Sequence, residues 1–179
     1  FTPADIEIPD LIEDDRPYAG YLGLSLAHQR RAGDVFDHTA LEIGIVGEWS
    51  GAEGLQKAIH AAVPNEPRPE GWSVQLDNEP GITLAHQRRW RSRQVPIFAW
   101  LEADAIPQVG FRLGNIWTDA TVGATTRVGF RLPDDFGVPR ISEFVDATTV
   151  SDPEERWSVY GFARVTGAVV ARDIFLDGD

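Results

Sequence analysis

Two residue types are absent from the sequence: its 179 residues include neither cysteine nor methionine. Without cysteine the chain can form no disulfide bond, no thiolate metal site and no cysteine nucleophile. The chain opens with Phe1-Thr2-Pro3, without an initiator methionine and without a charged or apolar leader. We therefore expect a mature or trimmed product.

Long apolar runs are also missing. None approaches the roughly 18 residues that a membrane-spanning helix needs. This excludes spanning helices, but a strand of a membrane barrel needs only about 9–11 alternating residues. Basic residues are few, 16 Lys and Arg against 28 Asp and Glu. This balance excludes non-specific nucleic-acid binding as an expected function, because such binding relies on cations that neutralise phosphates.

What the sequence does contain is β-sheet pattern. Six stretches have period-2 alternation and turn residues at their ends. They are Gly20–Arg31, Asp37–Gly47, Pro80–Trp90, Val95–Gly114, Thr118–Leu132 and Trp157–Arg172. Several reach ten residues or more, whereas strands of soluble domains cluster near about 5–6. The length favours a membrane barrel, although alternation by itself also fits a soluble β-sandwich.

The alternation predicts which side chains would face the lipid. One face of the first two strands is apolar, with Leu22, Leu24, Leu26, Leu41, Ile43 and Ile45. The other face is small or polar, with Gly23, Ser25, Glu42 and Gly44. In an antiparallel barrel the first set points outward and the second inward.

A nine-residue pattern occurs twice. Residues 23–31 and 81–89 agree at seven of nine positions, and both end in His-Gln-Arg-Arg. Nothing on either side recurs, so we interpret the echo as two strands with the same inside–outside register. In an up-and-down meander, every second strand runs in the same direction.

One helix is expected, at Gly51–Val63. Ser50 and Glu53 form a capping-box pattern, and Pro64 ends the segment. The apolar positions follow helical spacing. They are Leu55, Ile59 and Ala62.

The same helix carries the residues best suited to chemistry. Gln56 and His60 lie four apart and project from one face. An imidazole can take a proton from water near neutral pH, and an amide can donate to a developing oxyanion. An ordinary solvated histidine is the competing interpretation. The other histidines lie in predicted strands, where ordinary strand roles are expected: His28, His38 and His86.

Two acidic groups could be mistaken for calcium ligands. They are Asp134 with Asp135, and Asp177-Gly178-Asp179. Asp-Gly pairs are far more often turns, so we expect turns there. Asp14, Asp15 and Arg16 are expected to form a turn that leads into the first strand.

Several short motifs occur in a fixed order along nearly the whole chain. They are Asp15-Arg-Pro-Tyr-Ala-Gly20, Gln56-x-x-x-His60, Gly71-Trp72, Gln75-x-x-Asn78-Glu79-Pro80, Leu113-Gly114-Asn115 and Ile174-Phe-Leu-Asp-Gly178. Together they resemble the lipid A 3′-O-deacylases of Gram-negative outer membranes.

The resemblance implies an all-β fold, an antiparallel transmembrane β-barrel of twelve strands with a short extracellular loop helix. Residues 1–179 then form a single partial barrel domain that lacks strands before Phe1 and after Asp179. It also implies a monomer in the bacterial outer membrane, with lipid A of lipopolysaccharide as its partner.

The resemblance also implies roles for individual residues. His60 matches the family's general base, Gln56 its oxyanion-stabilising glutamine, and Glu66 a nearby glutamate. A bound calcium ion is implied, but its ligands match positions upstream of Phe1. A family lysine falls near Glu13 or Asp14 and is absent. The implied reaction is hydrolysis of an acyl ester at the 3′ position. A non-catalytic barrel of the family and a soluble all-β binding domain are the alternatives.

Overall fold

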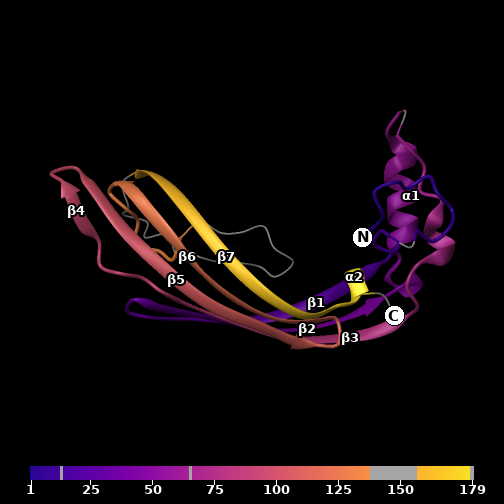
Figure 1. The fold of residues 1–179 in the computed structure, drawn as a ribbon, viewed down its shortest axis with the longest axis horizontal. Helices are drawn as coiled ribbons and strands as arrows, with labels where there is room; N and C mark the ends of the chain where they lie inside the picture. The colour runs from indigo at the N-terminus through magenta and orange to yellow at the C-terminus, as the bar shows by residue number, and fades with distance from the viewer. Residues whose placement is uncertain (13, 65, 138–156, 178–179) are drawn as a thin grey trace.

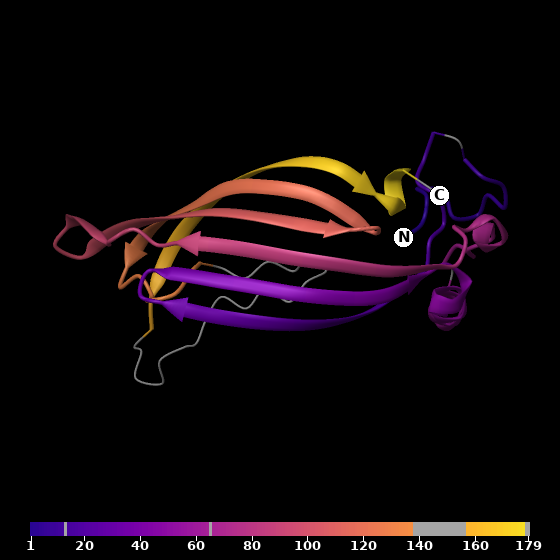
Figure 2. The same ribbon diagram turned by 90° about the horizontal axis from the view of Figure 1, so that it is seen from below.

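The computed structural model describes residues 1–12, 14–64, 66–137 and 157–177. Its centre is one antiparallel sheet in the order β1-β2-β3-β5-β6-β7, with β4 paired to β5 (Figures 1 and 2). The strands are β1 (Tyr21–Ala32), β2 (Val35–Val46), β3 (Glu79–Trp90), β4 (Val95–Phe98), β5 (Leu101–Gly114), β6 (Trp117–Phe130) and β7 (Val159–Asp173). The helices are η1 (Glu48–Ser50), α1 (Ala52–Ala62), η2 (Gly71–Val74) and α2 (Ile174–Asp177).

Five of the six predicted strands are confirmed, with no end shifted by more than two residues. The remaining prediction, a single strand over Val95–Gly114, was wrong: the segment is a hairpin in which β4 pairs with β5. The turn at Ala99–Trp100 contains no Gly, Asn or Asp. The apolar alternation therefore runs through it without the usual turn signal.

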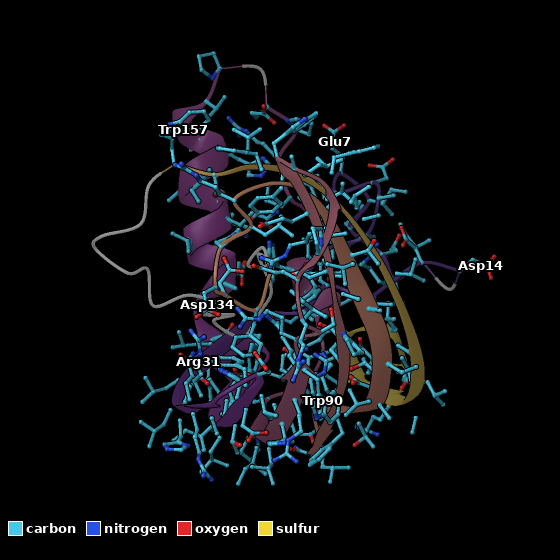
Figure 3. The ribbon with its side chains drawn as sticks, turned by 90° about the vertical axis from the view of Figure 1, so that its left-hand side faces the viewer. Glu7, Asp14, Arg31, Trp90, Asp134 and Trp157 are labelled. Carbon is cyan, nitrogen blue, oxygen red and sulfur yellow. The ribbon has the colours of Figure 1, made fainter. Side chains whose placement is uncertain are left out.

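The two faces of the sheet differ as the alternation predicted. Leu22, Leu24 and Leu26 are 60%, 72% and 78% exposed. Glu42, which lies opposite Ser25 on the other face, is 5% exposed. The sheet curves into a trough (Figure 3), and within the described chain no second sheet covers the leucines. The β-sandwich alternative is therefore wrong, because a sandwich buries its apolar faces against each other.

The repeated nine-residue pattern also has a structural explanation. Its two copies lie in β1 and β3, on either side of β2, and Thr39 is paired with both His28 and His86. The copies run in the same direction and in the same register, as expected for alternate strands of a meander. His86 lies on the outer face, where its Nδ1 is 2.8 Å from the Thr39 hydroxyl oxygen.

The predicted helix is confirmed as α1, but its predicted cap was wrong. The N-cap is Gly51, whose φ of 72° is left-handed, and the Ser50 hydroxyl before it accepts from the backbone N–H of Ala52 at 3.3 Å. Ser50 belongs to η1, and its hydroxyl donates to the carbonyl of Gly47 at 2.6 Å. Glu53 instead forms an ion pair with Lys57 at 2.6 Å.

The apolar stripe of α1 is not part of a core. Leu55 and Ile59 are 66% and 54% exposed. The polar side chains of α1, Gln56 and His60, hydrogen-bond to other residues of the β2–β3 connection. No helix within the described ranges is long and apolar enough to cross a membrane.

Some predictions fall outside the described residues. These are residues 138–156 of the segment Arg131–Arg156, and Glu13, Gly178 and Asp179.

Candidate active site

The candidate site is built on the long connection between β2 and β3. This connection leaves the sheet at Gly47 and returns at Asn78. It places α1 at one end of the trough, whereas the β1–β2 turn lies at the other end (Figure 1). Gly47 has a φ of 90°, and a Cβ there would lie 2.7 Å from the carbonyl oxygen of Asp77. The backbone N–H of Trp49 donates to Asn78 Oδ1 at 2.8 Å. These contacts hold the two ends of the connection together, so the position of α1 relative to the sheet is fixed.

Gln56 is oriented by a tryptophan. The indole Nε1–H of Trp72 donates to Gln56 Oε1 at 2.9 Å, and Trp72 is only 4% exposed. Because the indole nitrogen is a donor only, it selects the amide oxygen of Gln56. The amide nitrogen keeps its two N–H groups, and no described residue accepts from them. That nitrogen is the chemically useful end for binding an oxyanion.

His60 is oriented by a backbone carbonyl. Its Nδ1 lies 2.7 Å from the carbonyl oxygen of Pro67, and the side chain is half-buried. A carbonyl oxygen only accepts, so the proton of the neutral ring lies on Nδ1. The lone pair is then on Nε2, where a general base needs it.

Glu66 does not join this pair. Its side chain is exposed, and the part of the chain that the structure describes contains no hydrogen bond or ion pair between Glu66 and another described residue. The carbonyl of Pro67, one residue further on, holds the imidazole instead. The role of Glu66 stays a prediction.

The Asp15–Gly20 motif supports the site from behind. Asp15 accepts hydrogen bonds from the backbone N–H of Ala4 at 2.6 Å and of Arg16 at 2.8 Å. These two bonds hold the pKa of Asp15 below its usual range. The turn expected here is therefore present, but Asp15 binds backbone N–H groups and Arg16 stays exposed.

Tyr18 links this motif to Gly71-Trp72. Its hydroxyl donates to the carbonyl of Ile6 at 2.7 Å, and its ring lies 5.1 Å from the Trp72 ring. A Cβ on Gly71 would overlap the Tyr18 ring and come within 2.9 Å of the Ile8 carbonyl oxygen. Burial raises the pKa of the Tyr18 hydroxyl. The two motifs thus form one packed unit that fixes Trp72, and through it Gln56.

An aromatic cluster fills the trough beneath the connection. Phe1 stacks on Phe175 at 3.9 Å, and Tyr21 lies edge-on to Trp117 at 5.4 Å. Tyr21 also donates its hydroxyl to Glu42 on the inner face. Sequence reasoning missed this cluster, because its members come from distant segments. Gly44 makes room for it, since a Cβ there would lie 2.6 Å from the Tyr21 hydroxyl oxygen.

A cavity of about 380 Å³ lies between α1 and η2. It is lined by Glu48, Glu53, Lys57, Glu70, Trp72, Ser73, Gln75, Leu76, Asp77 and Asn78. The lining is mostly polar and acidic, so it is ill-suited to a fatty acyl chain. Neither Gln56 nor His60 contributes to it.

The implied calcium ion finds no set of ligands here. Across residues 1–12, 14–64, 66–137 and 157–177, no three carboxylate or imidazole side chains converge in a way that could hold a metal. The four acidic residues of the cavity do not meet that condition. The described residues therefore do not fit the ion by themselves.

The remaining histidines lie on the sheet, away from α1. His38 Nδ1 is 3.3 Å from Gln29 Nε2 on the inner face, and His86 lies on the outer face beside Thr39. Their ordinary strand roles agree with the sequence interpretation.

Comparison with known proteins gives two findings. The family model described as "Outer membrane protein LpxR" matches residues 1–179. The solved structure of LpxR from Salmonella typhimurium matches with a TM-score of 0.77 and 20% sequence identity, over 99% of this chain. The chain spans 60% of the length of that structure, so the curved sheet corresponds to a part of its barrel. A search of curated proteins found no match.

Proposed function

The chain belongs to the LpxR family of outer-membrane lipid A 3′-O-deacylases, and from this premise we propose that it carries the general base and one oxyanion donor of an ester hydrolase. The proposed substrate is the 3′-linked acyl ester of lipid A. The observation that carries the proposal is the 2.7 Å contact of His60 Nδ1 with the Pro67 carbonyl, which leaves Nε2 free as a base.

In the proposed reaction, His60 Nε2 takes a proton from a water molecule as its oxygen attacks the ester carbonyl carbon. The carbonyl oxygen becomes an oxyanion, toward which the free N–H groups of Gln56 donate. The bond to the sugar oxygen then breaks, and the imidazolium returns its proton to that oxygen. The products are a fatty acid and a free 3′ hydroxyl.

The half-buried position of His60 suits this role. The ring stays accessible to water, while the Pro67 carbonyl prevents it from rotating freely. In the imidazolium, Nδ1–H still donates to the same carbonyl, so proton uptake requires no rearrangement. Trp72 gives Gln56 the same kind of pre-set orientation.

A non-catalytic barrel of the family is the second candidate. One observation favours it: within the described residues Glu66 forms no hydrogen bond or ion pair with His60, which is held by the Pro67 carbonyl instead. In this alternative His60 and Gln56 only stabilise the connection. The expected monomer, the calcium ion and the single partial-barrel domain stay predictions under both candidates.

The test is deacylation of lipid A by the full-length protein, followed by mass spectrometry of the extracted lipid. His60→Ala should lower kcat by about 10²–10⁴-fold, the usual contribution of a general base. Gln56→Ala should cost about 10²–10³-fold or less. Lys57→Gln lies on the same helix and is the matched control, with activity near wild type.

Barrel assembly is followed separately by heat-modifiable gel migration. Activity at the wild-type level in a well-assembled His60→Ala protein would refute the mechanism. Activity absent from wild type as well would leave the non-catalytic barrel in place.

A further inference from the structure

The chain turns back over the inner face of the sheet after β6. Arg131 has a left-handed φ of 52°, which redirects the backbone. The next six residues, Leu132–Gly137, then lie against the inner face at the end of the trough opposite α1. We refer to them as the crossing segment.

Asp134 ties the crossing segment to one side of the trough. Its carboxylate pairs with Arg31 of β1 at 2.7 Å and with Arg91, which directly follows β3. The Arg31 guanidinium also donates to the Asp134 carbonyl at 2.9 Å. Viewed from this end, Arg31 and Asp134 lie close together (Figure 3).

Asp135 ties the same segment to the other side. Its carboxylate pairs with Arg127 of β6. Arg127 also pairs with Asp104 of β5, with its Nε 2.9 Å from Asp104 Oδ1, and both side chains are fully buried. Pro133 is a third partner of Arg127, whose Nη2 donates to the Pro133 carbonyl at 3.2 Å.

Phe136 and Gly137 fill the space between these two anchors. The Phe136 ring stacks on Phe36 of β2 at 5.3 Å, and the Arg31 guanidinium lies 5.5 Å from its centre. Phe136 is 2% exposed. Gly137 lies over Ile106, since a Cβ on Gly137 would be 3.5 Å from Ile106 Cδ1.

These contacts join two adjacent residues to strands near opposite edges of the sheet. The partner of Asp134 is on β1 and the partner of Asp135 is on β6, with β2, β3 and β5 between them. A segment that binds strands near both edges of a curled sheet must cross the space that the sheet encloses. We infer that Leu132–Gly137 is an internal plug that closes the barrel lumen at the end opposite α1.

The chemistry of the plug fits this role. The inner face beneath it carries five arginines among the described residues, which are Arg31, Arg89, Arg91, Arg127 and Arg164. A lumen lined by these cations would hold water and anions if it were open. The plug supplies two carboxylates, three backbone carbonyls and one aromatic ring to them. The inference is independent of the proposed esterase activity.

The absence of cysteine allows a direct test. Residues 1–179 contain no cysteine, so Ile106→Cys places one thiol beneath the plug in a full-length protein from which any cysteine outside these residues is replaced by serine. A water-soluble maleimide measures the accessibility of this thiol. The inference predicts slow labelling in the otherwise unaltered barrel. Adding Asp134→Asn and Phe136→Gly should raise the rate by about tenfold or more, because labelling follows the population of the open state.

Two controls accompany this experiment. Arg93→Cys, in the exposed loop after β3, should label rapidly with and without the plug substitutions. Asp34→Asn removes another carboxylate that pairs with Arg91 but lies outside the plug, and it should leave labelling of the Ile106→Cys thiol unchanged. Heat-modifiable migration shows that each barrel is assembled.

Either of two results would overturn the inference. One is rapid labelling of the Ile106→Cys thiol while the plug is unaltered; this result alone would overturn the inference. The other is an unchanged slow rate after Asp134→Asn and Phe136→Gly in a correctly assembled barrel.

Discussion

The indole N–H of Trp72 donates to the side-chain oxygen of Gln56 across 2.9 Å, and this bond decides which end of the amide is available. Trp72 comes from η2 and Gln56 from α1, sixteen residues apart. The bond couples the packed Tyr18–Gly71–Trp72 unit to the proposed oxyanion donor.

Replacing Trp72 by Phe should therefore lower activity without unfolding the site. The variant keeps a ring against Tyr18 but removes the N–H, so the Gln56 amide is free to turn. Loss of the donor itself lowers kcat by about 10²–10³-fold. We expect a smaller decrease in kcat for Trp72→Phe, with KM nearly unchanged. The measurement is steady-state deacylation by assembled protein. A Trp72→Phe enzyme with wild-type kcat would show that the bond does not orient the amide.

The same unit predicts different outcomes for two glycines. Gly71→Ala should destabilise the connection by about 1–3 kcal/mol, because its Cβ would overlap the Tyr18 ring. Gly54→Ala on α1 is the matched control: a Cβ there meets nothing within 4 Å, and alanine favours a helix over glycine by about 1 kcal/mol. Limited proteolysis of residues 47–78 reports both changes. Equal protease resistance of the two variants would contradict the packing described for Tyr18.

Adjacent residues of β1 should differ sharply in their tolerance of charge. Leu24→Arg places a cation on the face that contacts lipid, which costs about 2–4 kcal/mol near the middle of the membrane. Ser25→Arg places the same charge on the inner face, opposite Glu42, and should be tolerated. Urea titrations of the full-length protein refolded into vesicles measure both. Comparable destabilisation by the two arginines would mean that the faces are assigned incorrectly.

The plug should respond to acid through Asp134. The hydrogen bond from Arg31 holds the pKa of the Asp134 carboxyl below its ordinary value of 3.8. Since the pKa is lower in the docked state, the stabilisation is complete above about 3.8. It is lost as the pH falls through the lowered pKa. The carboxylate is well exposed, so solvent screens the pair and the effect is small.

The measurement is the urea midpoint of wild type and of Asp134→Asn as a function of pH. The difference between them should be constant from about pH 7 to about pH 5 and should shrink below about pH 4, as the wild-type carboxyl becomes neutral like the amide. Asp34→Asn, outside the plug, serves as the control. A difference that disappeared already near pH 5 would contradict the Arg31 pairing.

The sequence by itself was sufficient for five of the six predicted strands, for the faces of the first two strands and for the helix. Alternation such as that of Leu22, Gly23 and Leu24 is local, because successive side chains of any strand point to opposite faces. Periodicity likewise placed α1 to within a residue at each end. Gln56 and His60 lie on one helix as predicted, and residues four apart lie on the same side of any α-helix. Their roles stay a prediction.

Only the tertiary structure decided what those side chains touch. The Pro67 carbonyl orients His60 and the Trp72 indole orients Gln56 through the folding of the β2–β3 connection. The crossing of Asp134 and Asp135 between β1 and β6 depends on the curvature of the sheet. The β4–β5 turn and the Gly51 cap were missed for a related reason: neither carries the side chains by which such features are usually recognised. Pattern in a sequence reports the repeat of the backbone, whereas partners depend on how distant strands curl around a common interior.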